Sequence, residues 1–547
     1  MAMHVPSAPG FAQMLTEGTR FYSGVDETVQ RSIEACRLLT RIISTSYGPK
    51  GLNKMVVTHL GKMFITNDAA TIVKELENEH PGVKLVIMAS EMQEKEIGDA
   101  TNFTLIFAGA LLDQAEELLR MGISVADITD GYELALKKAL ELLETIVCGT
   151  VTDFRDQNQI SRAIKASITS KQYGNEDFLT KLISTACISL MPEKGKSFNV
   201  DRVRTIKLLG SGLLSSSVMN GMVFKRETEG DINKAENAKV VVYACAVDIN
   251  QTETKGTVLI KTANELLNYT KDEEDLLEKQ IKAIADTGAK VVVSGGKVGD
   301  LALHFLNKYK LMAVRLTSKF DIRRVANSVG AIALTNLIPP TADDMGHCDK
   351  VYLDEIGDTS VVVFQQEKKE GSISTIILRG ATDNSMDDVE RAIDDGVNNF
   401  KVLTKDERLL PGAGATEVEL SRLLTQFADT RSGLEQYAVK KFAQALEVFP
   451  KILAENAGVK AMEILAKLHA AHQEGLKNVG FNIEEDGEAI IDAEKAGIFD
   501  LFLTKSSAMR LAVGATNTLL KVNKIVMAKP AGGPKPPKTG PQDADDE

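Results

Sequence analysis

The chain has 547 residues, of which 44% are hydrophobic and 26% are charged. This length exceeds what one ordinary hydrophobic core contains and predicts about three domains. The net charge of −12 argues against a general nucleic-acid binder, which would need clustered positive charge. No signal-peptide pattern and no apolar stretch long enough to span a bilayer is present, so we expect a cytoplasmic protein without a membrane partner.

The first 150 residues predict an almost wholly helical region. Residues 1–20 are expected to be loosely ordered, and from residue 26 apolar residues recur at helical spacing as far as a glycine- and proline-bearing turn at 47–51. The further expected elements are a hairpin of 54–58 with 62–66 and helices over 72–76, 83–96, 103–121 and 125–147.

The composition changes near residue 149. Helical segments continue to about residue 190, and strands then alternate with helices, which indicates an α/β region. The expected strands are 206–209, 222–224, 240–247, 290–294, 313–315, 331–334, 351–355, 360–366 and 374–379. Helices are expected between them over 273–287 and 299–308.

Helices return from residue 387 to about 474. A hairpin about 482–491, a helix over 506–522 and a disordered tail over 530–547 are expected to follow. Helical material at both ends predicts one domain built from both termini, with the strand-rich middle as an insertion.

Cysteine and histidine spacing gives no metal-site pattern. The five cysteines lie far apart, without a C-x-x-C pair, and are expected to be ordinary thiols in a reducing compartment. His469 and His472 lie near each other but without a third ligand, so we expect them on a solvated helix face.

A loop of small residues, 98–102, opens an apolar helical run. Backbone N–H groups at a helix N-terminus favour an anion. Asp99 would repel a bare phosphate, but a Mg²⁺ between the two would bind both, because that cation takes carboxylate and phosphate oxygens. The alternative is a Gly-Asp turn that only caps a buried helix.

Besides this loop, the sequence contains two more glycine-bearing turns, at 48–51 and 412–414, and two acids at or within predicted helices, Asp68 and Asp395. ATP hydrolysis needs such parts: backbone donors for phosphates, a carboxylate for Mg²⁺ and another that orients the attacking water. Each part taken singly also has a structural interpretation, as a common turn or a solvated acidic helix face. The motif G-x-x-x-x-G-K-[ST] is absent, which argues against a P-loop NTPase.

The segment 291–300 predicts a strand, a glycine turn and a helix, as in dinucleotide-binding folds. Its glycines do not match G-x-G-x-x-G, and no acid of the expected kind follows about 20 residues on. We interpret it as a structural βα turn. A dinucleotide-dependent enzyme is an alternative that this segment alone would support.

Five ordered motifs together resemble those of the group II chaperonins, in register from about residue 20 to 528. They are YGPKGLNKM at 47–55, TNDAATI at 66–72, GDATN at 98–102, ERAIDD at 390–395 and GAGATE at 412–417. The resemblance implies a multidomain chaperonin fold of mixed α+β and α/β character. The implied parts are a mostly helical equatorial ATPase domain (1–147 and 405–528), a small intermediate domain (148–214 and 369–404), an inserted α/β apical substrate-binding domain (215–368) with a helical protrusion near 250–287, and a disordered tail (529–547).

The same resemblance implies an ATP-dependent chaperone. Eight paralogous subunits would form each of two stacked rings, so this chain would have seven other kinds of subunit as partners. ATP hydrolysis with Mg²⁺ would close the rings around non-native proteins such as actin and tubulin. Asp395 lies in the intermediate segment, so it would reach the nucleotide only when that domain closes, which couples hydrolysis to closure.

Residue roles follow from the matching motifs. Asp99 would bind Mg²⁺, and Asp68 and Asp395 would orient and activate water. The residues expected to contact the nucleotide are Tyr47, Gly48 and Pro49, the phosphate-cradling Ala100, Thr101, Asn102 and Phe103, the nucleotide-sensing Thr169, Ser170 and Lys171, and the nucleoside-holding Gly412 and Asp500.

The chain departs from the family pattern around these carboxylates. Alanine replaces a family glycine at positions 69, 100 and 413, Asn102 replaces threonine, and Leu501 replaces proline. These changes predict weaker binding or slower turnover at this site. They also leave open a second function, a structural ring subunit that holds nucleotide with negligible turnover.

Overall fold

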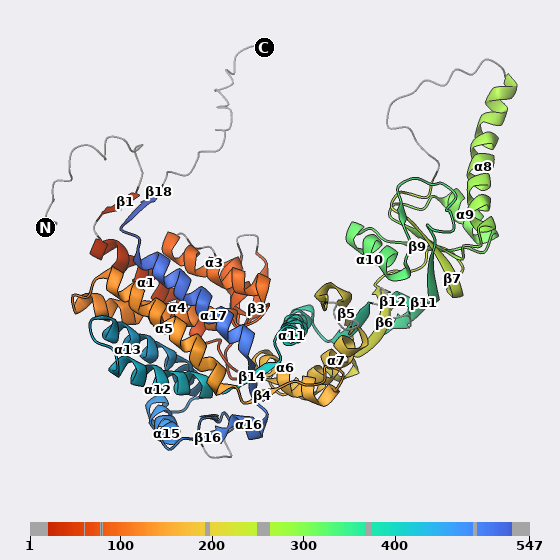
Figure 1. Cartoon of the computed structure of the whole chain (residues 1–547). Coiled ribbons are helices and arrows are strands. Elements are labelled where there is room, and N and C mark those ends of the chain that lie inside the picture. The colour runs from red at the N-terminus through yellow and green to blue at the C-terminus, as the bar shows by residue number, and fades with distance from the viewer. Residues whose placement is uncertain are drawn as a thin grey trace, which may run out of the picture.

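The computed structural model describes residues 20–527 apart from 24, 59–60, 77, 79, 192–196, 249–262, 367–372 and 485–488. The expectations for residues 1–19, for the tail and for the start of the protrusion at 250–262 lie outside the described residues. Three bodies follow one another in an arc (Figure 1): a helical body, a small body at the bend, and a sheet body that carries the long helix α8 (Ala263–Asp286).

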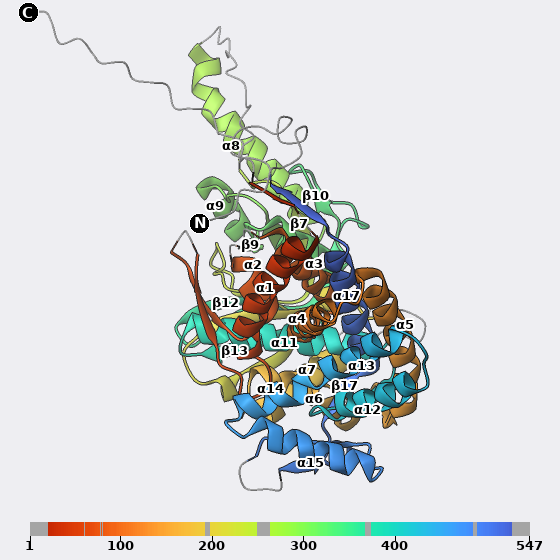
Figure 2. The same ribbon diagram turned by 90° about the vertical axis from the view of Figure 1, so that its left-hand side faces the viewer.

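Both ends of the chain build the helical body. Helix α4 (Thr101–Arg120) is buried along most of its length, because its sequence is apolar nearly all round. It packs against helices from both parts of the chain (Figure 2), and Phe107 meets Phe442 edge-to-face with ring centroids 5.4 Å apart. The surrounding helices are α1 (Val25–Ser44), α3 (Pro81–Glu96), α5 (Val125–Ile146), α12 (Ala415–Asp429), α13 (Glu435–Leu446) and α17 (Phe502–Leu520).

Smaller elements complete this body. Strand β1 (Arg20–Ser23) pairs antiparallel with β18 (Lys524–Met527), so the two ends of the described chain lie side by side. The remaining elements are the hairpin of β2 (Lys54–Val57) and β3 (Met63–Thr66), helices α2 (Ala69–Glu75), α14 (Val448–Asn456), α15 (Ala461–Gln473) and α16 (Ala493–Ala496), and the hairpin of β15 (Val479–Phe481) and β16 (Ile490–Asp492).

The small body packs three helices into one core with neighbouring strands. Its helices are α6 (Gln157–Lys171), α7 (Glu176–Ser189) and α11 (Asp383–Leu403). A three-stranded sheet of β4 (Gly149–Thr150), β14 (Arg408–Pro411) and β17 (Phe499–Leu501) lies where the chain passes between the small and helical bodies. In its register Leu410 pairs with Asp500, which fixes the position of that acid.

The sheet body contains most of a nine-stranded mixed sheet in the order β5-β13-β6-β12-β11-β7-β8-β9, with β10 beside β7. Apolar residues of α8 and α9 (Asp300–Lys308) cover one face, and α10 (Lys319–Val329) covers the other. The strands are β5 (Val203–Leu209), β6 (Ser217–Phe224), β7 (Lys234–Tyr243), β8 (Val291–Ser294), β9 (Met312–Arg315), β10 (Ala333–Leu334), β11 (Gly346–Ile356), β12 (Thr359–Gln365) and β13 (Ser374–Gly380).

The expected fold class, helical at both ends with an α/β insertion, is confirmed. Helix α10 was not expected, although Ser318 caps its start and Gly330, with φ +74°, ends it. The strand expected over 240–247 ends at Tyr243, because the chain there turns to follow the loop after β8. Among the described helices, none is both long and apolar enough to cross a membrane.

Candidate functional site

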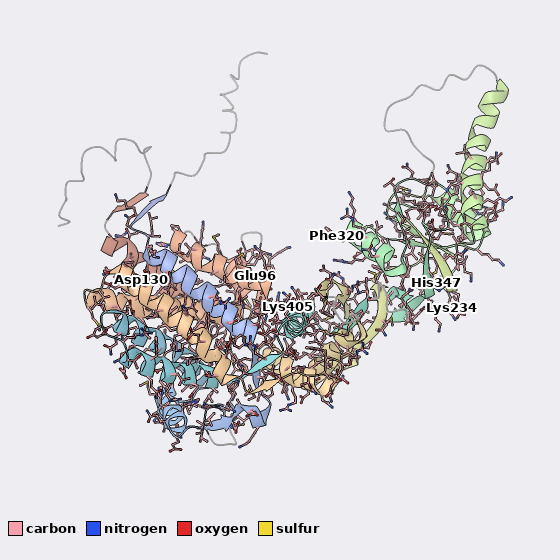
Figure 3. All side chains as sticks on the ribbon, in the orientation of Figure 1. Glu96, Asp130, Lys234, Phe320, His347 and Lys405 are labelled. Carbon is pink, nitrogen blue, oxygen red and sulfur yellow. The ribbon has the colours of Figure 1, made fainter. Side chains whose placement is uncertain are left out.

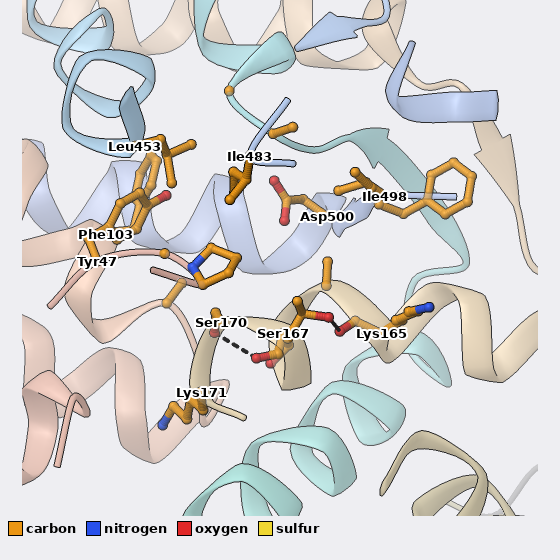
Figure 4. A pocket seen from close by; sticks show the side chains of 18 of the residues that line it. Tyr47, Phe103, Lys165, Ser167, Ser170, Lys171, Leu453, Ile483, Ile498 and Asp500 are labelled. Atoms are coloured by element: carbon orange, nitrogen blue, oxygen red, sulfur yellow. Dashed lines mark hydrogen bonds between the residues drawn. The ribbon is translucent and has the colours of Figure 1, made fainter. Parts of the chain in front are cut away.

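A cavity of about 380 Å³ lies between the helical and small bodies. This volume is in the range of small-molecule sites. Apolar side chains line one side, among them Tyr47, Phe103 and Leu453, while Ser167 and Lys171 of α6 lie on the other side (Figure 4). Phe103 stacks on Phe449 behind this wall, with ring centroids 4.1 Å apart.

Two glycine-bearing turns give the cavity its backbone donors. Helix α4 begins at Thr101 after Ala100, which gives no side-chain cap, so the first N–H groups of the helix lack an intrahelical partner, and residues 100–103 line the cavity. Ala100 has φ +63° and ψ +29°, a left-handed conformation that costs an alanine about 1–2 kcal/mol. Gly48 also has positive φ (+85°), a conformation that favours glycine, and a Cβ there would displace the end of the Leu453 side chain, 2.5 Å away.

Asp99 lies in the turn that precedes α4, directly before Ala100, and its carboxylate accepts hydrogen bonds from three donors. Oδ1 accepts from the Ala100 N–H (2.6 Å), while Oδ2 accepts from Ser167 Oγ (2.8 Å) and Asn399 Nδ2 (2.6 Å). Ser167 lies on α6 and Asn399 on α11, so two of the three helices of the small body hold one oxygen of this acid.

The residues present fit a hydrated Mg²⁺ at Asp99. Carboxylate oxygens accept more than one partner, which leaves Oδ1 of Asp99 with acceptor capacity. The side-chain oxygens of Asn67 and Asn399 also line this region, and both are buried without a hydrogen-bond partner. Among the described residues no group of three or more His, Cys, Asp or Glu could hold a metal, so an ion here would need oxygens from a ligand such as a phosphate.

Lys171 joins the other two predicted carboxylates. Its Nζ lies 3.0 Å from Asp68 Oδ1 and 2.5 Å from Asp395 Oδ2. The second oxygen of Asp68 caps α2 by accepting from the N–H and hydroxyl of Thr71. Lys171 lines the cavity, whereas Asp68 and Asp395 lie behind it.

Burial and the ammonium group set the charges of this triad. Burial would raise the pKa of Asp68, but Lys171 and the hydrogen bonds from Thr71 outweigh it and hold the pKa at about 2. Burial raises the pKa of Asp395 well above its ordinary value, since Asp99 and Asp68 add like charge and Lys171 compensates only in part. Burial would lower the pKa of Lys171, and the two carboxylates raise it instead. Lys171 is therefore a permanent cation between the two acids.

Asn102 lines the cavity, but its side chain contacts protein. Oδ1 accepts from the Ala69 N–H (3.0 Å) and Nδ2 donates to the Asn67 carbonyl (3.3 Å). Both bonds hold the loop that carries Asp68. One N–H of Nδ2 is thus directed at the Asn67 carbonyl, and the amide keeps a second N–H donor beside the cavity.

The far end of the cavity is built around Asp500. Lys505 Nζ lies 3.2 Å from Asp500 Oδ2, forms a second ion pair with buried Glu417, and sits 4.5 Å from the Phe103 ring centroid. Burial raises the pKa of Asp500, against the pull of Lys505. Gly412 lies behind the wall: a Cβ there would be 2.9 Å from Ile498 Cγ2.

The structure thus brings most predicted residues into one cavity. Those that line it are Tyr47, Gly48, Pro49, Asp99, Ala100, Thr101, Asn102, Phe103, Thr169, Ser170, Lys171 and Asp500, and those that do not are Asp68, Asp395 and Gly412. Residues that the sequence interpretation missed include Ser167, Asn399 and Lys505. Asn399 had a signal, because it follows Asp395 by one helical turn and so shares its face of α11.

Two sequence interpretations have clear outcomes. The expectation of a solvated histidine pair was wrong for His472, which is fully buried with ring nitrogens 2.8 Å from Glu419 Oε2 and 2.8 Å from the Val479 carbonyl. The glycine turn after β8 is filled by protein, since a Cβ at Gly296 would lie 2.8 Å from Ala246 Cα. Backbone packing therefore accounts for these glycines, and all five cysteines are free thiols.

The comparisons with known proteins agree with the motifs. Residues 39–530 match the TCP-1/cpn60 chaperonin family. Relatives include the T-complex protein 1 subunit theta of Homo sapiens (59% identical), of Gallus gallus (58%) and of Caenorhabditis elegans (51%), each aligned over the full length of both chains. The chain belongs to the TCP-1/cpn60 chaperonin family.

Proposed function

We propose that the chain is an ATP-hydrolysing, theta-type subunit of a cytoplasmic hetero-oligomeric chaperonin. The observation that carries the proposal is the cavity itself, where the N-terminus of α4 and Asp99 face Lys171 and its two carboxylate partners. The relatives, each named a subunit of T-complex protein 1, support a place among paralogous subunits. Two stacked eight-membered rings and clients such as actin and tubulin belong to the same proposal.

The proposed nucleotide would bind along the cavity. Its phosphates would meet the free N–H groups at the start of α4 and the Gly48 turn, and its base would lie against Tyr47 and Phe103. Asp500 would accept from the ribose hydroxyls. Mg²⁺ bound at Asp99 would neutralise charge on the phosphates.

Hydrolysis would depend on the lysine triad. A terminal phosphate within reach of Lys171 would compete for its ammonium group and weaken the pairs with Asp68 and Asp395. The freed carboxylates would then orient and deprotonate the attacking water, and the raised pKa of Asp395 suits a general base. Because Asp395 belongs to α11, turnover would follow the position of the small body.

We propose the domain division on the same grounds. One hydrophobic core unites residues from the N-terminal and C-terminal thirds, which supports an equatorial domain of 1–147 with 405–528. A second core supports an intermediate domain of 148–214 with 369–404, and the sheet body an apical domain of 215–368. Phe320, 68% exposed, projects from the start of α10 (Figure 3) and is suited to contact apolar segments of a non-native client.

Two substitutions test the proposal in the assembled complex. Asp395→Ala should leave nucleotide binding nearly intact and slow hydrolysis at this site by ~10²–10⁴-fold, because a water-activating carboxylate acts on the transition state. Asp99→Ala should weaken nucleotide binding itself. Photolabelling of this chain with 8-azido-ATP and single-turnover hydrolysis separate the two effects. The reverse pattern, with nucleotide lost in Asp395→Ala and kept in Asp99→Ala, would contradict the assigned roles.

A second candidate is a structural subunit that holds nucleotide with negligible turnover. The left-handed Ala100 and the Asn102 amide, which bonds to the loop of Asp68, favour it, since both are departures in the phosphate loop. In that case Asp395→Ala would not change the hydrolysis measured at this site.

A further inference from the structure

Asn399 reaches from the small body to the carboxylate predicted to bind the metal. It lies on α11, is 3% exposed, and lines the cavity. Its Nδ2 donates to Asp99 Oδ2 at 2.6 Å, whereas its Oδ1 is buried and has no hydrogen-bond partner.

The chemistry of the contact fixes the orientation of this amide. With nitrogen and oxygen exchanged, the amide oxygen would face the Asp99 carboxylate, and two acceptors would repel each other. The unpaired atom is therefore the amide oxygen of a residue that lines the cavity. Buried amide oxygens are nearly always paired, and this one has acceptor capacity left for a donor that binds beside Asp99.

The part of α11 that carries Asn399 packs closely on the turn of Asp99. A Cβ at Gly98 would lie 2.3 Å from Asn398 Cγ, so only glycine lets α11 approach the turn that carries Asp99. Ser167 of α6 donates to the same carboxylate oxygen as Asn399, at 2.8 Å. Two donors thus converge on Oδ2, and Oδ1 of Asp99 is left with acceptor capacity.

We propose that Asn399 is a positioning residue for magnesium at Asp99. Its Nδ2 orients the carboxylate, and its Oδ1 accepts a hydrogen bond from a water of the hydrated ion. Groups of this kind, which hold a metal ligand or its water, typically contribute 10–100-fold to metal affinity. The inference deepens the proposed function and rests on it, since it requires Asp99 to bind the metal.

The position of Asn399 adds a consequence for regulation. Asn399 and Asp395 lie one helical turn apart on α11, and one contacts Asp99 while the other pairs with Lys171. A movement of α11 therefore changes the hold on the metal ligand and the position of the proposed base together. Magnesium affinity at this site becomes a reporter of the position of the small body.

The test is the Mg²⁺ dependence of nucleotide binding by this chain in the assembled complex. Asn399→Leu keeps the side-chain size but removes both polar atoms, and Asn384→Leu, at an exposed position of the same helix, is the matched control. The readout is the Mg²⁺ concentration that gives half-maximal 8-azido-ATP labelling of this chain. We expect that concentration to rise 10–100-fold in Asn399→Leu, with the same labelling at saturating Mg²⁺, and to stay unchanged in the control.

An unchanged Mg²⁺ midpoint in Asn399→Leu overturns the inference, provided that Asp99→Ala shifts it. If Asp99→Ala leaves the midpoint unchanged as well, the proposed metal ligand itself is wrong, which separates the two failures. Where Asn399→Leu does not assemble, Asn399→Ser keeps a hydroxyl but shortens the side chain. It is expected to raise the midpoint, and an unaltered midpoint in that variant overturns the inference equally.

Discussion

The two altered positions of the phosphate loop should have opposite effects when they are restored singly to the family residues. Ala100→Gly removes a Cβ from a left-handed position, where alanine costs about 1–2 kcal/mol. Glycine also loses about 0.5–1 kcal/mol more entropy on folding, so the stability of the chain should change little. The backbone at the start of α4 can then approach a phosphate more closely, and we expect tighter nucleotide binding or faster turnover.

Asn102→Thr should instead slow hydrolysis. The substitution removes the bonds to the Ala69 N–H and the Asn67 carbonyl, which hold the loop of Asp68. At about 1 kcal/mol for each bond, the loss is about 2 kcal/mol. If all of it falls on the transition state, turnover drops roughly 30-fold. Nucleotide binding should change little, because the two hydrogen bonds of the Asn102 side chain are made to the loop of Asp68.

The assay is single-turnover hydrolysis in a complex whose other subunits carry alanine at the position of Asp395, with photolabelling as the measure of occupancy. The double variant Ala100→Gly with Asn102→Thr should gain less than Ala100→Gly alone. A gain in Asn102→Thr, or a gain that appears only in the double variant, would refute the assignment of Asn102 to the Asp68 loop. No gain in Ala100→Gly would mean that the loop has already adapted to alanine.

Three further predictions follow from the assembly, the triad and the buried histidine. Native mass spectrometry of the endogenous protein should find the chain in a complex near megadalton size, and a stable endogenous monomer would contradict the proposed assembly. As the pH is lowered, turnover should begin to fall above pH 3.8, the ordinary pKa of aspartate, because the pKa of Asp395 is raised and its ionised form is the base. Asp68, with a pKa of about 2, stays ionised in that range. A pH–rate profile that is flat down to pH 4 would show that Asp395 does not act in the rate-determining step. His472→Phe removes the hydrogen bonds to Glu419 and to the Val479 carbonyl, and should destabilise the contact of α15 with β15 by about 1–3 kcal/mol. Hydrogen exchange at Val479 should become faster, and unchanged exchange would show that these two buried bonds are dispensable.

Sequence patterns were most informative where a function depends on a short, continuous segment. The loop at 98–102 opens a helix as expected, and Ala100 is left-handed at a position where the resemblance predicts glycine. The strongly periodic helices were also predictable, because their buried faces follow a period that the sequence displays. These features depend on neighbours in the chain, which a single sequence contains.

Contacts between distant segments could not be read in the same way. Strands β4, β14 and β17 have two to four residues each, too few for an alternating pattern, and only their pairing places Asp500 at the cavity. His472 was misjudged because its partner, Glu419, is 53 residues away. Asn399 could be placed on the face of Asp395, but only the packing of α11 on Gly98 brings it to Asp99.

Residues of the small body hold each of the three acids proposed for the chemistry, although Asp99 and Asp68 belong to the helical body. Asp99 is held by Ser167 and Asn399, and Asp68 is held by Lys171, while Asp395 belongs to α11 itself. Helices α6 and α11 pack on each other in one core, so we expect them to move together. A nucleotide that contacts Lys171 would act on α6 directly, and one whose metal binds Asp99 would act on α6 and α11 through Ser167 and Asn399. If the nucleotide binds more tightly to a closed arrangement of these helices than to an open one, that difference in binding free energy would drive closure. We therefore place the coupling between hydrolysis and movement in α6 and α11.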